Sequence, residues 1–463
     1  MIRIIFKKEL KEIFRTSKIS WMIGGLLILT ILSVYNGYTY YKNHSRLLKE
    51  SQEVTYQQFI SQGNKNPHLG AHFGFYAYKP TADLAMIDNG IEDYTGNSFY
   101  LEPHKRGIIK FREVTDATSL KSFGFFNIAY LVQFIFPLFV FLICHNIFSK
   151  EWENGTIKML LSSKAGKLQL YMGKLLACLS VVFMIIGIIV LAAFGLLLTG
   201  TGHFGAVLPS FLIFVVGLCL FAIIMTSIAV SVSLLTRSAT LSLVILSGFW
   251  LTGVFLTPRL SAEVSKQTFP SITSIEFEHR TFNEMQYGVK GEGTKDQRRE
   301  QLLKRTLAAY HVDSIQRLPV FFIPITIEFF EESDGKVMDR AYSAVEQNQA
   351  RQDGLVRSLA IFSPFLAFRD FSMHMTATDM NTHNDFAEKA EIHRRKVGVI
   401  VDDFYQDHVE ASNDFWKTVP QFKYEPPGTG MRFLAAWSAM AVLVCWGVLT
   451  IGLMIFSYRK MSV

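Results

Sequence analysis

The sequence predicts a mainly α-helical membrane protein with six spanning helices, an N-terminal amphipathic helix and two large polar insertions. Half of the 463 residues are hydrophobic, yet 18% are charged. That mixture is too apolar for one soluble domain and too charged for a chain that lies wholly in a bilayer. Six apolar runs each approach the roughly 20 residues that a helix needs to cross the hydrocarbon core.

Residues 1–18 have the pattern of an amphipathic helix that lies along a membrane surface. The apolar side chains of one face are Ile2, Phe6, Leu10, Ile13 and Phe14. The basic side chains of the other face are Lys7, Lys8, Lys11, Arg15 and Lys18. Both sets recur at helical spacing, and a basic helix of this kind beside a span lies in the headgroup region. Its positive charge predicts that the N-terminus lies in the cytoplasm.

The order of apolar and polar segments predicts the topology. Spans are expected at residues 19–41, 123–147, 175–256 (three spans) and 431–458, and insertions at residues 42–122 and 257–430. The short connections at residues 148–174 and 236–238, and the tail at residues 459–463, all carry Lys or Arg. Because short cytoplasmic segments are enriched in these residues, we expect both termini in the cytoplasm and both insertions outside it.

The two insertions are expected to be α+β or mostly helical and to pack together. Residues 66–80 mix Gly, Pro and aromatic side chains, which favours loops and short strands. Residues 320–330 are apolar but broken by Pro324. We therefore expect a buried strand or an interfacial segment there, and then a turn at Asp334 and Gly335. Helical spacing predicts helices over residues 44–54, 300–310, 337–361 and 383–416.

The loop at residues 148–174, called here the lysine-rich loop, carries the most informative local pattern. It holds the acidic pair Glu151 and Glu153, an Asn-Gly-Thr break and then an apolar-faced segment at residues 157–161. Its basic residues are Lys150, Lys158, Lys164, Lys167 and Lys174. Such a loop can present a short helix to a soluble partner beneath the membrane. The alternative is an ordinary amphipathic connector whose glutamates balance its lysines.

The run Glu-Trp-Glu-Asn-Gly-Thr-Ile-Lys, followed by Leu-Leu-Ser and then Gly-Lys before the third span, resembles the cytoplasmic signature of ABC-2 type transporter permeases. Such permeases also begin with an elbow helix along the membrane, and their signature loop contacts the ATPase subunit. The resemblance implies that the two glutamates pair with basic residues of the ATPase and that apolar side chains fill a groove in it. The implied coupling residues are Glu151, Glu153, Gly155, Thr156, Ile157, Lys158, Leu160 and Leu161.

Segments of both insertions, among them residues 66–80 and 372–395, resemble bacterial ABC-2 permeases that carry a domain of unknown function named DUF3526. The resemblance covers most of the chain. It implies a multi-pass protein of the bacterial inner membrane that dimerises with a second copy or a related permease. It further implies a separate ATPase that binds ATP and Mg²⁺, and it allows for a periplasmic or envelope partner. It implies no particular substrate.

Several chemistries are not expected in this chain. Residues 291–295 lack the spacing of a nucleotide-binding P-loop, so the chain is not expected to be an enzyme or to bind a cofactor of its own. The histidines of the insertions are irregularly spaced and predict no metal site, and no nucleic-acid-binding motif is present. The spans hold almost no ionisable side chains besides His145, which argues against a proton-driven carrier.

Three functions fit these patterns to different degrees. The first is a permease with a substrate path, for which Asn127, Gln133 and Pro137 on the second span are candidate lining residues. Helix packing is the alternative role for these three. The second function is a subunit that transmits ATPase movement to the external domain without passing a substrate. A membrane-anchored external enzyme or receptor fits least well, because no catalytic constellation is recognisable.

Overall fold

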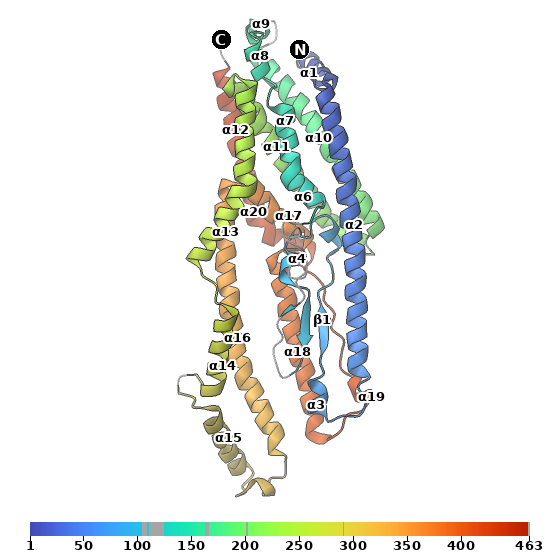
Figure 1. The fold of residues 1–463 in the computed structure, drawn as a ribbon, viewed down its shortest axis with the longest axis vertical. Coiled ribbons are helices and arrows are strands. Elements are labelled where there is room, and N and C mark those ends of the chain that lie inside the picture. The colour runs from blue at the N-terminus through green and yellow to red at the C-terminus, as the bar shows by residue number, and fades with distance from the viewer. Residues whose placement is uncertain (104–108, 111–124, 163–165, 201, 290, 462–463) are drawn as a thin grey trace.

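The computed structural model shows an elongated, mostly helical molecule with both chain ends at the same end (Figure 1). It describes residues 1–103, 109–110, 125–162, 166–200, 202–289 and 291–461; the expected first residue of the second span, 123, and Lys164 lie outside them. Helices account for 79% of the structure. Six helical segments of the described chain are long and apolar enough to cross a membrane, which confirms the predicted class. They are Ile19–Ile60, Ile128–Glu153, Lys167–Gly200, Phe204–Thr236, Ala239–Thr268 and Thr429–Lys460.

The first two helices are distinct and meet at Thr16. Helix α1 (Ile2–Arg15) ends there and α2 (Ser17–Ile60) begins, because Thr16 has an extended backbone with φ −80° and ψ 111°. Lys18 therefore belongs to α2, which corrects the expected end of the first helix at residue 18. Helix α2 runs from the first span into the first insertion without a break, so the helix expected at residues 44–54 is its outer part.

The first insertion contains a small antiparallel sheet. Strand β1 (Phe75–Tyr78) pairs with β2 (Ser98–Leu101), which pairs with β3 (Ile109–Lys110). Along β1, buried and partly exposed side chains alternate, as expected for a strand with one packed face. The connecting helices are α3 (Pro67–Ala71), η1 (Asp83–Met86) and α4 (Glu92–Thr95). The expected loops and short strands are thus confirmed, with α3 as an addition.

Two spans are interrupted by π-helical turns. The second span consists of α6 (Ile128–Tyr130), the π-helical turn η3 (Leu131–Ile135) and α7 (Phe136–Cys144). The fifth span consists of α12 (Ala239–Leu251), the π-helical turn η4 (Thr252–Leu256) and α13 (Thr257–Thr268). A proline, Pro137 or Pro258, lies in the first turn after each. Proline lacks the N–H of a regular helical hydrogen bond, which fits the irregular backbone that precedes each of these two prolines.

The remaining spans surround α11 (Phe204–Thr236), which packs against α7, α10 (Lys167–Gly200), α12 and α20 (Thr429–Lys460). The turn from α11 to α12 uses Arg237, whose φ of 53° is left-handed, and Ser238, whose side chain accepts a hydrogen bond from Leu241 N. The short connection expected at residues 236–238 is therefore present. It lies at the same end of the molecule as the two termini (Figure 1).

The second insertion begins as an arm that runs beside the rest of the molecule (Figure 1). The arm continues from α13, the outer end of the fifth span, and contains α14 (Ser274–Tyr287), α15 (Lys295–Ala309), the turn η5 (Ile315–Arg317) and α16 (Phe322–Leu359). Residues 320–330 are not the expected strand or interfacial segment, and Asp334 and Gly335 are not a turn, because α16 includes nearly all of them. Pro324 is tolerated because the first turn of a helix has no partners for its N–H groups.

After the arm, the chain enters the bundle of spans. The short turn η6 (Ala360–Phe362) leads into α17 (Pro364–Thr376), and α17 packs against α11 and α20. The indole Nε1 of Trp446 donates to the carbonyl oxygen of Ile361 over 3.0 Å. Trp446 lies about 25 Å from Thr429 and about 21 Å from Lys460 at ~1.5 Å per residue. The turn before α17 therefore reaches the middle of the sixth span, although the sequence places it in the external insertion.

The two insertions share a hydrophobic core of their own, separate from that of the spans. Helix α18 (Met380–Asp407) and the short α19 (Asn413–Trp416) replace the single helix expected over residues 383–416. Phe59 of α2, Phe75 of β1, Phe386 of α18 and Trp416 of α19 are fully or almost fully buried in this core. A bridge between Lys65 and Ala411 also joins the insertions. The two insertions therefore pack together, as expected.

Candidate functional site

The lysine-rich loop lies at the end of the molecule that also holds both termini (Figure 1). It forms two short helices, α8 (Ser149–Glu153) and α9 (Ile157–Ser162). Gly155 between them has a φ of 69°, in the left-handed region where glycine has no steric cost. A Cβ there would meet open space, so backbone conformation and not crowding favours glycine. The helix break expected from the Asn-Gly-Thr sequence is therefore present.

A buried lysine ties this loop to α1 and α10. The Nζ of Lys174 donates to Glu9 Oε1 over 2.8 Å, to the carbonyl oxygen of Ile147 over 2.9 Å and to Glu151 Oε1 over 3.2 Å. The exposed fractions are 0% for Lys174, 1% for Glu9 and 7% for Glu151. Buried charges are costly to desolvate and persist where they are paired and hydrogen-bonded. Lys174 therefore holds three segments in one arrangement.

A more exposed set of charges borders this buried centre. Glu12 accepts a hydrogen bond from Lys150 over 2.6 Å and forms an ion pair with Lys8 at 2.9 Å. Partial burial would raise the pKa of Glu12, but the hydrogen bonds from Lys150 and Lys8 lower it to about 2. Burial likewise opposes the charge on Lys8, and its hydrogen bonds to Glu9 and Glu12 raise its pKa. These residues extend the contact between α1 and the loop; together with the buried centre they form the Lys174 cluster.

Close backbone packing supports the same contact. Gly173 precedes Lys174 on α10, and a Cβ at Gly173 would collide with the side chain of Ile5 on α1. The rings of Phe148 and Tyr171 stack with their centroids 5.7 Å apart. The Nζ of Lys174 lies 5.5 Å from the centroid of Phe148. Helix α1, the loop and α10 therefore form a single packed unit beneath the spans.

Both glutamates have hydrogen-bond partners within the chain, with Glu151 buried and Glu153 exposed; their pairing with basic residues of an ATPase stays a prediction. Glu151 pairs with Lys174, and its carboxylate also accepts a hydrogen bond from the Thr156 hydroxyl. Glu153 Oε1 accepts from the backbone N of Ala239 over 2.9 Å. Ala239 begins α12, where the unpaired N–H groups of the helix end favour negative charge. The glutamates thus fix the loop to α10 and α12.

The surface that another protein could contact is the outer side of α9. Ile157 is 1% exposed, so it packs inward instead of filling a partner's groove. Leu161 packs against the core of the spans, and Leu160 is partly exposed. Lys158 is exposed, and Met159 is 69% exposed. The sequence pattern did not single out Met159, although it lies two residues after the inward Ile157 and thus about 200° around the helix, on the opposite face.

The amphipathic pattern of α1 largely matches the structure. Lys7, Lys8, Lys11 and Arg15 are exposed, as expected for a helix with a basic outer face. Ile13 is buried, and Phe6 and Leu10 pack against the spans. Glu9 is a buried member of the inner face that the sequence pattern did not reveal, because its partner Lys174 is 165 positions away.

The three candidate pathway residues lie at the opposite end of the second span. Asn127 is 2% exposed, caps α6 by accepting from Tyr130 N, and donates to Asn89 over 2.9 Å. Gln133 donates to Asp88 Oδ2 over 3.3 Å, and Pro137 is buried. Each therefore has a structural contact, and Gln133 also lines a small pocket.

One protein-family model matches almost the whole chain. The family model described as ABC-2 family transporter protein matches residues 3–463. That range begins in α1 and ends after α20, so it covers the lysine-rich loop and both insertions as well as the spans. No curated protein matches the chain.

Proposed function

Because the chain belongs to the ABC-2 family of transporters, and so is a membrane component of an ABC transporter, we propose that it is a permease subunit driven by a separate ATPase. The ATPase would bind ATP and Mg²⁺ and would contact α8 and α9. The chain would work as a dimer, with itself or a related permease. The lysine-rich loop and both termini would be cytoplasmic, in a bacterial inner membrane. Membership of the DUF3526 subgroup is part of this proposal.

One observation carries the proposal: the outer side of α9 is exposed while the Lys174 cluster holds its base. A displaced loop must move α1 and α10 with it, because Lys174 links them through two carboxylates and a carbonyl oxygen. Low local dielectric strengthens such hydrogen bonds. A force applied at Met159 would therefore move α1, the lysine-rich loop and α10 together. Such a joint movement is what coupling between an ATPase and the spans requires.

Co-purification tests this proposal. The full chain is isolated from its native membrane in mild detergent, and accompanying proteins are identified by mass spectrometry. We expect an ATPase with the natural chain and its loss with Met159→Asp, which places a charge in the exposed apolar contact. Val409→Asp is the matched control, because Val409 is 70% exposed at the far end of the molecule. An ATPase that stays with the Met159→Asp protein would contradict the proposed contact.

A second candidate function, transmission of movement to the external region, is favoured by the continuity of α2. This helix has 44 residues and is about 66 Å long at ~1.5 Å per residue. It contacts α1 and α10 near one end, and near the other Phe59 packs against Phe75 and Trp416. An uninterrupted helix with both ends packed can carry displacement from the Lys174 cluster to the external core.

Spin labels test this second candidate. Leu69→Cys in the first insertion and Phe282→Cys in the arm are both at exposed positions, at 66% and 63%, and the four native cysteines are replaced by alanine. Transmission predicts that ATP added to the assembled complex changes the distance between the labels. An unchanged distribution in a complex that still hydrolyses ATP would rule it out.

A further inference from the structure

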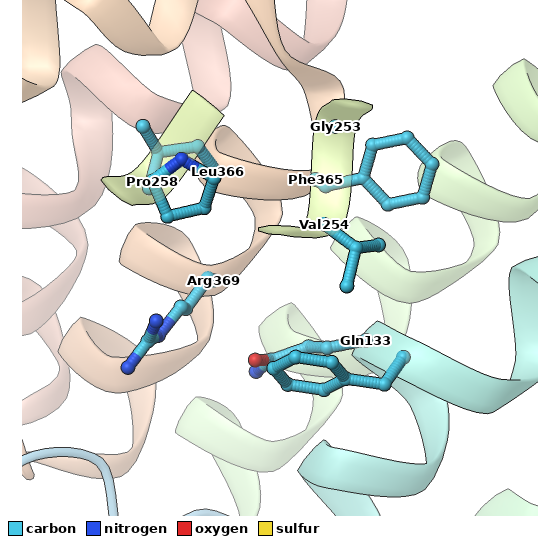
Figure 2. A pocket seen from close by; sticks show the side chains of 8 residues that line it. Gln133, Gly253, Val254, Pro258, Phe365, Leu366 and Arg369 are labelled. Carbon is cyan, nitrogen blue, oxygen red and sulfur yellow. The ribbon is translucent and has the colours of Figure 1, made fainter. Parts of the chain in front are cut away.

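A small pocket opens between the second span, the fifth span and α17, at the end of the bundle away from the termini. Figure 2 shows Gln133 and Arg369 on one side of it and the apolar residues Pro258, Leu366 and Phe365 on the other. The lining residues are Gln133, Phe134, Gly253, Val254, Pro258, Phe365, Leu366 and Arg369. Three separate parts of the chain, more than 100 residues apart in sequence, therefore contribute to it.

Both π-helical turns form walls of this pocket. Gln133 and Phe134 belong to η3, and Gly253 and Val254 belong to η4. A π-helical turn widens the helix and is frequent at functional sites. Two of these residues accept hydrogen bonds through their carbonyl oxygens: Trp250 Nε1 donates to Phe134 over 2.8 Å, and Ser363 Oγ donates to Gly253 over 3.3 Å. The irregular backbone is therefore stabilised by contacts between the three parts.

Arg369 is the charged group of the pocket. Its side chain is partly buried, and its guanidinium makes no hydrogen bond or ion pair with any residue that the structure describes. The carboxylate of Asp88 accepts from Ser372, Gly90 N and Gln133 instead. Asp370, the next residue along α17, is paired with Arg357 at 3.7 Å. Arg369 therefore lines the pocket with N–H donors that no described residue accepts from, although its charge interacts with the nearby carboxylate of Asp88.

The position of the pocket along the fifth span indicates what kind of molecule could supply a hydrogen-bond acceptor for Arg369. Gly253 lies about 21 Å from Ala239 along the fifth span, and the hydrocarbon core is about 30 Å thick. The ring of Phe365 packs against Phe221 and Phe249, with centroids 5.8 and 5.5 Å apart. Arg369 is one turn further along α17, toward the external region. The pocket has a volume of only about 20 Å³, so a small anionic group beside Arg369, near the membrane boundary, fits this position better than a large apolar one.

We propose that this pocket binds a phosphate group, with Arg369 as the residue that contacts its oxygens. The planar guanidinium matches two oxygens of a phosphate at once. The amide of Gln133, which already donates to Asp88, lies beside it and limits the width of the site. The inference goes beyond the proposed function, because it does not depend on an ATPase contact at α9.

The phosphate can belong to a lipid headgroup or to a soluble molecule, and the experiment distinguishes the two. The full chain in uncharged detergent is titrated with short-chain phosphatidylglycerol in one arm and with inorganic phosphate in the other. Binding is followed by native mass spectrometry and thermal shift. Binding in the lipid arm alone identifies a lipid headgroup, and binding in both arms shows that the phosphate group suffices.

We expect Arg369→Gln to weaken binding at least tenfold, because the charge-assisted bonds are lost. Arg351→Gln is the matched control, an exposed arginine on α16, and should bind as the natural chain does. Arg369→Lys keeps the charge but not the two-pronged geometry, so it should fold and bind severalfold more weakly. Two outcomes would overturn the proposal: no binding by the natural chain in either arm, or binding by both Arg369 variants that is as tight as that of the natural chain.

Discussion

The bundle of spans holds a basic side chain between helices at each end, and the two are surrounded very differently. Lys174 has three oxygen partners between 2.8 and 3.2 Å and no exposed surface. Arg369 is partly exposed and makes no hydrogen bond or ion pair with the described residues; it interacts with the carboxylate of Asp88 only through its charge, while Ser372 and Gly90 N donate hydrogen bonds to that carboxylate. Lys174 therefore stabilises one arrangement of the chain, whereas Arg369 is left available to a ligand.

This difference predicts that loss of Lys174 damages the fold. In Lys174→Met, the buried Glu9 and Glu151 would keep only the exposed Lys8 as a cationic partner, and breaking a buried pair from one side costs about 3–5 kcal/mol. Thermal unfolding in detergent measures the loss. Lys167→Met on the same helix is the control, because Lys167 is exposed and such substitutions stay within about 0.5 kcal/mol. Equal unfolding temperatures for the two variants would show that the cluster is not structural.

At the end of the bundle away from the termini, the prediction concerns close packing between helices and not a charged side chain. A Cβ at Gly253 would collide with the ring of Phe365, whereas a Cβ at Gly248 in the same span would meet open space. Gly253→Ala should therefore destabilise the chain by about 1–3 kcal/mol, while Gly248→Ala should be neutral or slightly stabilising. The measurement is again thermal unfolding. If both variants unfold like the natural chain, α17 does not pack against η4.

The regions of the molecule differ in how far the sequence predicts them. The spans follow from the length of apolar runs, which is a local property, and the break at Gly155 follows from local turn chemistry. The pairing of Glu9 with Lys174 depends on residues that are distant in sequence, so an amphipathic pattern places Lys174 only as one more basic loop residue. Its inward orientation follows from helix packing that the sequence does not display.

The second insertion shows a different limit. A short apolar run can be a strand or part of a helix, and periodicity alone does not separate the two. That ambiguity explains the expectation for residues 320–330, which lie almost entirely in α16. The entry of α17 into the bundle does not follow from the sequence either, because its 13 residues are too few to cross a bilayer. The pairs of Asp370 with Arg357 and of His374 with Asp379 likewise become visible only in the fold.

The smallest expected effect distinguishes the buried centre of the Lys174 cluster from its exposed border. The pKa of Glu12 is lowered from 4.5 to about 2, so its ion pairs stabilise the fold fully above pH 4.5 and less as pH falls toward 2. The side chain is 41% exposed, so solvent screening limits this contribution to less than about 1 kcal/mol.

Glu12→Gln should therefore lower the unfolding temperature slightly at pH 6, and its difference from the natural chain should shrink as the pH approaches 2. Glu300→Gln is the control, since Glu300 also pairs at 2.6 Å but with Lys304, on an exposed helix surface. Added salt should reduce the effects of both variants, because exposed pairs are screened. A loss at pH 6 as large as that of Lys174→Met would place Glu12 in the buried centre and remove the distinction.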